Sequence, residues 1–194
     1  MAKANAQHKA TAFFITTTMA AVVIGVGKPS AQPEAPTQAP QATAQLVNLK
    51  NQEIGVATLT QTPAGVKIAL NARNLPANSS LAFHVHQTGA CNASKKFTTA
   101  GNHFNPTGKA HGHQAKGGSH AGDMPNQQTA PDGTLVTTVL NTGITLDDNP
   151  ATGVMKTGGT ALILHAKPDD YKSQPAGAAG DRIACGVIKS VTAR

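Results

Sequence analysis

The chain has 194 residues, which is enough for one domain with a self-sufficient core and a tail. It carries a formal charge of +7, but its 16 Lys and Arg residues are scattered and not interleaved with aromatic side chains. This excludes a typical nucleic-acid-binding protein and suits a small anionic partner better. With 19 glycines, 12 prolines and no tryptophan, the composition favours short aliphatic strands joined by many turns.

The first 27 residues have the pattern of a targeting segment. Lys3 and Lys9 precede an uncharged run over residues 10–27 that includes Phe13, Phe14 and Ile15. A basic start before an apolar run predicts export to the periplasm, the cell envelope or the cell exterior. The run is short for a bilayer span and its small-residue cleavage signals are imperfect, so a cleaved signal peptide and a retained anchor both stay open. Membrane association is expected only if the segment is retained.

Residues 28–43 contain four prolines and almost no large apolar side chain. Such a Pro/Gln/Ala-rich stretch favours an extended, solvated linker over packed structure. We therefore expect a single folded domain over residues 44–194.

The rest of the chain alternates between apolar and polar residues in short stretches, and no helical period persists. This pattern predicts strands, and turn signals at 62–65 and 131–133 separate two pairs of them. The expected strands cover residues 44–49, 54–59, 66–70, 81–86, 134–140, 161–165 and 183–191. Two stretches resist strand assignment: residues 89–128, here called the first loop, and residues 167–181, here called the second loop. Loops of this length in a compact domain are usually functional.

Three histidines on predicted strands could bind a metal. His84 and His86 lie two residues apart, so a strand presents both imidazoles on one face. Alone, such a pair is often only the polar face of an amphipathic strand. His165 ends an apolar strand, and together with the other two it could form a copper site, because imidazole suits copper.

The first loop holds four of the eight histidines. Three imidazoles and one carboxylate, from His103, His111, His120 and Asp123, satisfy the preference of zinc for tetrahedral sites without a thiolate. Glycines within the loop would let these ligands converge. A surface loop that binds metal only casually is the alternative, and His113 is a rival for His111.

Cys91 and Cys185 are the only cysteines of the chain. In an exported protein, a lone and distant pair of this kind is more often a disulfide than two free thiols. We expect the bridge to tether the first loop to the last strand.

Five segments together resemble the copper,zinc superoxide dismutases, closest to their bacterial exported branch, over residues 44–188. The segments occur in order and with matching spacings. They are FHVH at 83–86 with GAC at 89–91, AGNHFNP at 100–106, HAGD at 120–123, HAKPDD at 165–170, and GDRIACGVI at 180–188.

The resemblance implies a Greek-key β-sandwich, or flattened barrel, of about eight antiparallel strands with two long functional loops. It also implies one copper and one zinc ion per subunit. The implied copper ligands are His84, His86, His103 and His165, and the implied zinc ligands are His103, His111, His120 and Asp123. Both monomers and homodimers are compatible with the sequence.

The implied activity is conversion of superoxide to oxygen and hydrogen peroxide by alternating reduction and oxidation of copper. His103 would bridge the metals and carry a proton, and Arg182 would dock the anion. Asp169 resembles the carboxylate that links a copper histidine to a zinc histidine. Asp181 departs from the family pattern and would weaken the field of Arg182 if it faced the site. A copper carrier or chaperone without turnover is the alternative function.

Overall fold

The computed structural model describes residue 39 and residues 41–191, all within one compact unit of residues 38–194. The predicted targeting segment lies outside the described residues, and so does most of the predicted linker. Within the described part of the chain, no helix is long and apolar enough to cross a membrane.

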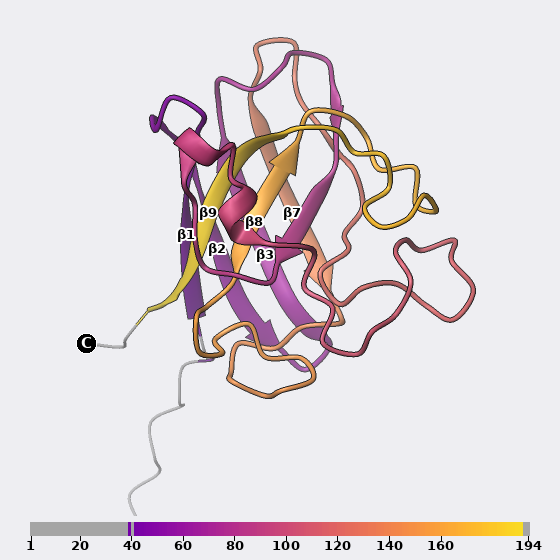
Figure 1. The fold of residues 1–194 in the computed structure, drawn as a ribbon. Helices are drawn as coiled ribbons and strands as arrows, with labels where there is room; N and C mark the ends of the chain where they lie inside the picture. Colours follow the sequence, from indigo (N-terminus) through magenta and orange to yellow (C-terminus); the bar gives the residue numbers. More distant parts are fainter. Residues whose placement is uncertain (1–38, 40, 192–194) are drawn as a thin grey trace, which may run out of the picture. The chain divides into compact units, whose positions relative to one another are not determined.

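The regular secondary structure of the described residues is almost entirely β-strand (Figure 1). Two short 3-10 turns, η1 (Ala93–Lys95) and η2 (Thr98–Ala100), are the exceptions among them. The strands are β1 (Gln41–Asn48), β2 (Glu53–Thr62), β3 (Gly65–Ala72), β4 (Ser80–Leu81), β5 (Phe83–His86), β6 (Gln127–Gln128), β7 (Leu135–Asn141), β8 (Ala161–His165) and β9 (Arg182–Ser190).

Each expected strand is present, except that the one expected over residues 81–86 is divided into β4 and β5, and two further corrections apply. β1 begins at Gln41, so residues 41–43, expected in the linker, belong to the first strand. Ala42 is fully buried and pairs with Leu59 of β2 and Ser190 of β9, which explains the earlier start. The second correction is β6, a two-residue strand inside the first loop that pairs with β4.

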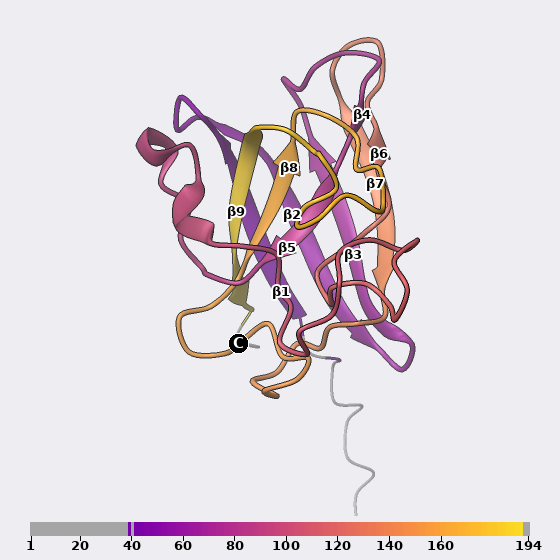
Figure 2. The ribbon, with the colours of Figure 1, turned by 45° about the vertical axis from the view of Figure 1, so that its right-hand side comes forward.

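The strands form one antiparallel sheet in the order β5-β8-β9-β1-β2-β3-β7 and a second, two-stranded sheet of β4 and β6. The sheet curls strongly, as the turned view in Figure 2 shows. Pairs such as β1 with β9 and β3 with β7 join strands far apart in sequence, as the Greek-key prediction requires. The expected all-β class is therefore confirmed.

Segment 80–86 connects the two sheets. Its first part, β4, pairs with β6, and its second part, β5, pairs with β8. The change occurs at Ala82, whose N–H donates to the carbonyl of Lys167 and whose carbonyl accepts from the N–H of His165. Because β5 therefore runs beside β8, His84 and His86 are brought next to the strand that ends in His165.

Aliphatic side chains at alternating strand positions fill the space inside the curl. In β3 the buried residues are Val66, Ile68, Leu70 and Ala72, separated by exposed ones. Each large aliphatic side chain removed from water contributes about 1.5–3 kcal/mol. Phe83 and Val85 of β5 belong to this core, so His84 and His86 face the opposite side of the strand.

The predicted turn at residues 62–65 joins β2 to β3, and Thr62 pairs with Gly65 across it. Gly65 has a φ of 130°, and a Cβ there would overlap the carbonyl of Asn141. The second predicted turn, at residues 131–133, also forms, closed by the N–H of Gly133 on the carbonyl of Ala130. Both turn predictions are confirmed.

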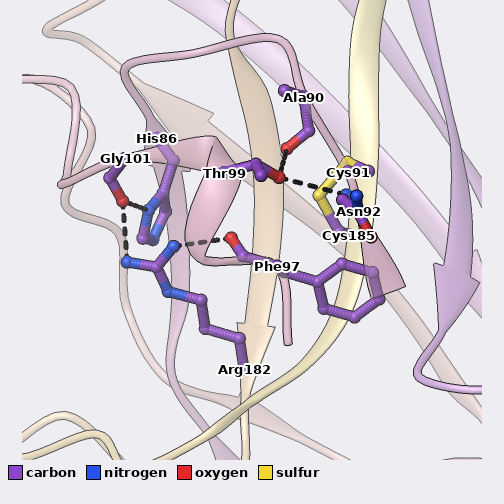
Figure 3. Close-up of a disulfide and its surroundings, with 9 residues drawn as sticks. All are labelled: His86, Ala90, Cys91, Asn92, Phe97, Thr99, Gly101, Arg182 and Cys185. Carbon is purple, nitrogen blue, oxygen red and sulfur yellow. Dashed lines mark hydrogen bonds between the residues drawn. A yellow bond between two sulfur atoms is a disulfide. The ribbon is translucent and has the colours of Figure 1, made fainter. Parts of the chain in front are cut away.

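Cys91 and Cys185 form a disulfide, with a Cα–Cα distance of 5.6 Å, as predicted (Figure 3). The bridge ties the start of the first loop to β9. Beneath it, Phe97 is fully buried with Ile163 of β8 in a small apolar cluster of its own. The segment carrying Phe97 and Gly101 is therefore held against β9 both covalently and by packing.

We expect the double variant Cys91→Ser, Cys185→Ser to lose as much as about 4 to 5 kcal/mol of unfolding free energy, because the bridge closes a loop of 94 residues. Urea unfolding of the metal-free protein measures this loss. Reductant should shift the parent protein to the same midpoint and leave the variant unaffected. An unchanged midpoint in the variant would contradict the prediction.

Candidate metal centre

The first loop returns alongside β5 and carries its ligands to the histidines of that strand. His84 forms an isolated antiparallel bridge with Asp123, and His86 forms one with His103. Between them, the N–H of Val85 donates to the carbonyl of Gly122. A Cβ at position 122 would overlap the carbonyl of Val85, so this close approach requires glycine.

The structure brings the two predicted ligand sets together. His84, His86, His103 and His165 offer ring nitrogens that all lie within 4.8 Å of one another, and these four side chains are at most 4% exposed. His103, His111, His120 and Asp123 form a second such group. His103 belongs to both groups, with one ring nitrogen for each, as a bridging ligand would require.

In the second group, three Nδ1 atoms gather around one carboxylate. The Oδ1 atom of Asp123 lies 2.9 Å from His103 Nδ1, 3.2 Å from His111 Nδ1 and 3.4 Å from His120 Nδ1. Its Oδ2 atom accepts the N–H groups of Gly112 and His120. The carboxylate is thus oriented by the main chain of the loop and presents its other oxygen to three imidazoles.

Two buried ring nitrogens test whether these residues fit metal ions. His84 Nδ1 and His103 Nε2 have no hydrogen-bond partner among the described residues. His86 Nε2 faces His165 Nε2 at 3.4 Å, where one ring nitrogen meets another. Leaving a buried polar atom unpaired costs about 1–3 kcal/mol, so such atoms normally have a partner. A copper ion would supply a partner for all four nitrogens, so the residues fit it.

Burial sets the charge of the first group. Desolvation lowers the pKa of His103 to about 4 and that of His165 to about 3, and it lowers the pKa of His84 and of His86 as well. These imidazoles are therefore neutral at pH 7, which is the form that binds a metal.

The second group contains charged side chains. Burial alone would raise the pKa of Asp123, but hydrogen bonds from His103, His111 and His120 outweigh it and lower that pKa well below its usual range. Burial likewise opposes protonation of His111. Its hydrogen bonds to Asp123 and Asp169 outweigh the burial and raise its pKa to about 9. A cation at this position is thus matched by two carboxylates.

These shifts predict that the metal-free protein is most stable near pH 6.5. Below that pH the unfolded chain takes up protons on histidines whose folded pKa is depressed, so stability falls as pH drops toward 4. The raised pKa of His111 contributes stability below pH 6.5 that is lost toward pH 9. Thermal unfolding of chelator-treated protein between pH 4.5 and 9 tests this, and a midpoint that rises as the pH is lowered from 6.5 to 4.5, or as it is raised from 6.5 to 9, would contradict it.

Asp169 joins the two groups by contacting one histidine of each, His84 and His111, at the ring nitrogen that faces away from its own group. Its Oδ2 atom lies 2.9 Å from His84 Nε2, and its Oδ1 atom lies 3.0 Å from His111 Nε2. Gly177, with a φ of 67°, packs directly on this carboxylate, and a Cβ there would overlap both Asp169 and His111. The carboxylate therefore fixes the orientation of one imidazole from each group.

Arg182, at the start of β9, is anchored to the first loop. Its Nη1 atom donates to the carbonyl of Phe97 and its Nη2 atom to the carbonyl of Gly101, both at 2.7 Å (Figure 3). The Gly101 carbonyl also lies 2.9 Å from His86 Nδ1. Partial burial lowers the pKa of Arg182 from its ordinary value, but a guanidinium stays charged at any physiological pH.

Arg182 and three histidines of the first group line a cavity of about 280 Å³. Pro175 and Ala176 of the second loop form part of its wall. We call this the copper-side cavity. Asp181 is exposed and forms no ion pair among the described residues, so it does not neutralise the neighbouring guanidinium.

His113 does not join either group. It is exposed, and its ring lies 5.8 Å from that of Tyr171. Of the two rivals in the first loop, the structure thus brings His111 to the centre. The sequence reading missed Asn126 and Gln174, which bond the main chain of Asp169 and His111; main-chain partners leave no sequence pattern by which they could be found.

The fold and the centre together define a β-sandwich protein with two adjoining groups of side chains that could each hold a metal ion and that share one histidine. The family model described as Copper/zinc superoxide dismutase (SODC) matches residues 53–188. Superoxide dismutase [Cu-Zn] 2 of Aquifex aeolicus is 50% identical over 149 residues, which cover 77% of this chain and 86% of that protein. The chain therefore belongs to the copper/zinc superoxide dismutase family.

Solved structures agree with this assignment. A SOD-like protein from Bacillus subtilis matches with a TM-score of 0.72 and 33% identity, covering 75% of this chain and 96% of that one. The Cu/Zn superoxide dismutase from Brucella abortus matches with a TM-score of 0.61 and 25% identity, covering 77% and 99%.

Proposed function

We propose that this protein disproportionates superoxide to oxygen and hydrogen peroxide at copper held by His84, His86, His103 and His165, next to zinc held by His103, His111, His120 and Asp123. The observation that carries the proposal is the copper-side cavity, where three histidines of a complete ligand set meet an anchored arginine. Copper, when bound, supplies reversible one-electron chemistry at this position.

His103 is the proposed proton carrier. Its Nδ1 atom faces Asp123 and the other zinc-side imidazoles, whereas its Nε2 atom is buried and unpartnered among the described residues. A proton can therefore be held or released at Nε2 without disturbing the contacts at Nδ1. His103 also lines the copper-side cavity, so that proton is within reach of a small molecule bound there.

Arg182 is the proposed anion-docking residue. Its two hydrogen bonds to main-chain carbonyls hold the guanidinium at the cavity, where its charge and remaining N–H donors can receive a small anion. Electrostatic steering is established for superoxide dismutases as a class. A copper carrier needs the histidines but has no use for an anion-binding arginine, so this residue supports turnover over transport alone.

The disulfide supports export as the setting for this activity. A bridge such as Cys91–Cys185 persists in oxidising compartments and is rare in the cytosol. We propose a periplasmic, cell-envelope or extracellular location, in line with the targeting pattern of residues 1–27.

Reconstitution tests the proposed function. Protein stripped with a chelator is reloaded with zinc alone or with zinc and copper, and superoxide decay is followed after pulse radiolysis. We expect fast decay only in the sample with copper. If the protein binds one equivalent of copper but superoxide decays no faster than in buffer alone, the protein would instead be a carrier.

A further inference from the structure

The first and second loops are joined by two carboxamide side chains. One extends from the second loop to the first, and the other extends from the first loop to the second. Gln174 of the second loop bonds the main chain of His111: its Oε1 atom accepts the His111 N–H at 2.9 Å, and its Nε2 atom donates to the His111 carbonyl at 3.0 Å. Asn126 of the first loop bonds the main chain of Asp169 in the same way, accepting its N–H and donating to its carbonyl, both at 2.8 Å.

The two residues held in this way are themselves bonded to each other, since His111 Nε2 lies 3.0 Å from Asp169 Oδ1. Each carboxamide thus fixes one end of the same imidazole–carboxylate contact. The other ring nitrogen of His111 faces Asp123 in the proposed zinc set. The direction in which His111 presents that nitrogen therefore depends on both carboxamides.

We propose that Gln174 and Asn126 are positioning residues for the zinc site, acting through His111 and Asp169. The proposal rests on the zinc ligand set given under the proposed function. Both N–H donors of the Gln174 carboxamide are used, because its Nε2 atom also donates to the carbonyl of Lys172 at 3.0 Å. Asn126 is fixed further by its own N–H, which donates to the hydroxyl of Tyr171 at 2.8 Å.

The position of Gln174 makes the proposal testable without disturbing the core. Gln174 is exposed although it bonds a fully buried residue, so truncating it leaves no internal cavity. The next two residues, Pro175 and Ala176, form part of the wall of the copper-side cavity. One exposed side chain thus connects the zinc set to the loop that borders the copper set.

Chelator competition with the full chain measures the effect on zinc. Gln174→Ala should weaken zinc binding about tenfold, the low end of what loss of an outer-shell partner costs. Copper affinity and the melting temperature of the metal-free protein should stay unchanged. Gln114→Ala is the matched control. Gln114 lies in the first loop and is exposed, as Gln174 is, but its side chain makes no hydrogen bond within the described chain. It should bind zinc as the parent does.

Cobalt in place of zinc gives a readout that a purely structural role would not change. The visible absorption bands of Co²⁺ report ligand geometry, so they should shift in Gln174→Ala and not in Gln114→Ala. Asn126→Ala should also weaken zinc binding. The zinc affinity of the double variant should be little lower than that of the weaker-binding single variant, because both carboxamides act on one His111–Asp169 contact.

The outcomes separate this proposal from the proposed function. A parent protein that binds no zinc would overturn the zinc ligand set and with it the positioning role. A parent that binds zinc, with Gln174→Ala unchanged in affinity and cobalt spectrum, would overturn the positioning role alone. Equal losses of zinc affinity, copper affinity and melting temperature would show a general effect on stability and would also overturn it.

Discussion

Replacing Arg182 with alanine should lower the superoxide rate constant at least about tenfold and leave the copper content unchanged. Superoxide offers one negative charge and little else to recognise, so its capture depends on a fixed positive group beside the metal. At 0.15 M salt, charges are screened over about 8 Å, so distant lysines contribute little and the guanidinium in the cavity dominates. The dependence of the rate on ionic strength should weaken as well.

Pulse radiolysis at several salt concentrations measures both effects. Arg73→Ala is the matched control, because Arg73 is an exposed arginine outside the copper-side cavity and its loss removes the same net charge. The control should keep nearly the full rate. An Arg182→Ala variant with full activity would rule out the docking role.

Replacing Asp123 with alanine should abolish tight zinc binding while copper still binds. The carboxylate contacts all three histidines proposed to hold zinc and accepts two main-chain N–H groups. Loss of an outer-shell partner alone costs 10–100-fold in affinity, so we expect roughly a hundredfold or greater loss for this ligand. The copper set shares only His103 with the zinc set and keeps all four imidazoles.

Metal analysis after dialysis, with isothermal titration of each metal, measures this difference. Asp148→Ala is the control, since Asp148 is an exposed aspartate whose side chain makes no hydrogen bond within the described chain. Loss of both metals together in Asp123→Ala would show that the centre is not divided as proposed.

Most of the longer strands could be predicted because only one face is buried, which leaves an alternating pattern in the sequence, whereas β8 is buried on both faces and was predicted from its continuous apolar run. The alternation is clear in β3 and also placed His84 and His86 on one face of β5. The alternating pattern did not predict β6, because two residues are too few to show a period. It also failed at residues 41–43, because small and polar residues look alike in a linker and in a strand whose burial depends on distant partners.

The sequence predicts which residues form the cluster better than it predicts which contacts hold them in place. Residue type and spacing brought out His111 and Asp123, but they left His113 as a rival until the loop path was known. That path depends on contacts with main-chain atoms, such as Gly122 against Val85 and Gln174 against His111. Main-chain groups are the same at every residue, so no sequence pattern identifies these contacts.

The most direct test of the divided centre is anomalous diffraction from crystals of the metal-loaded protein, recorded on both sides of the copper and zinc absorption edges. We expect one copper peak among His84, His86, His103 and His165, and one zinc peak among His103, His111, His120 and Asp123, with His103 between them. A single peak, or copper and zinc mixed at both positions, would contradict this expectation.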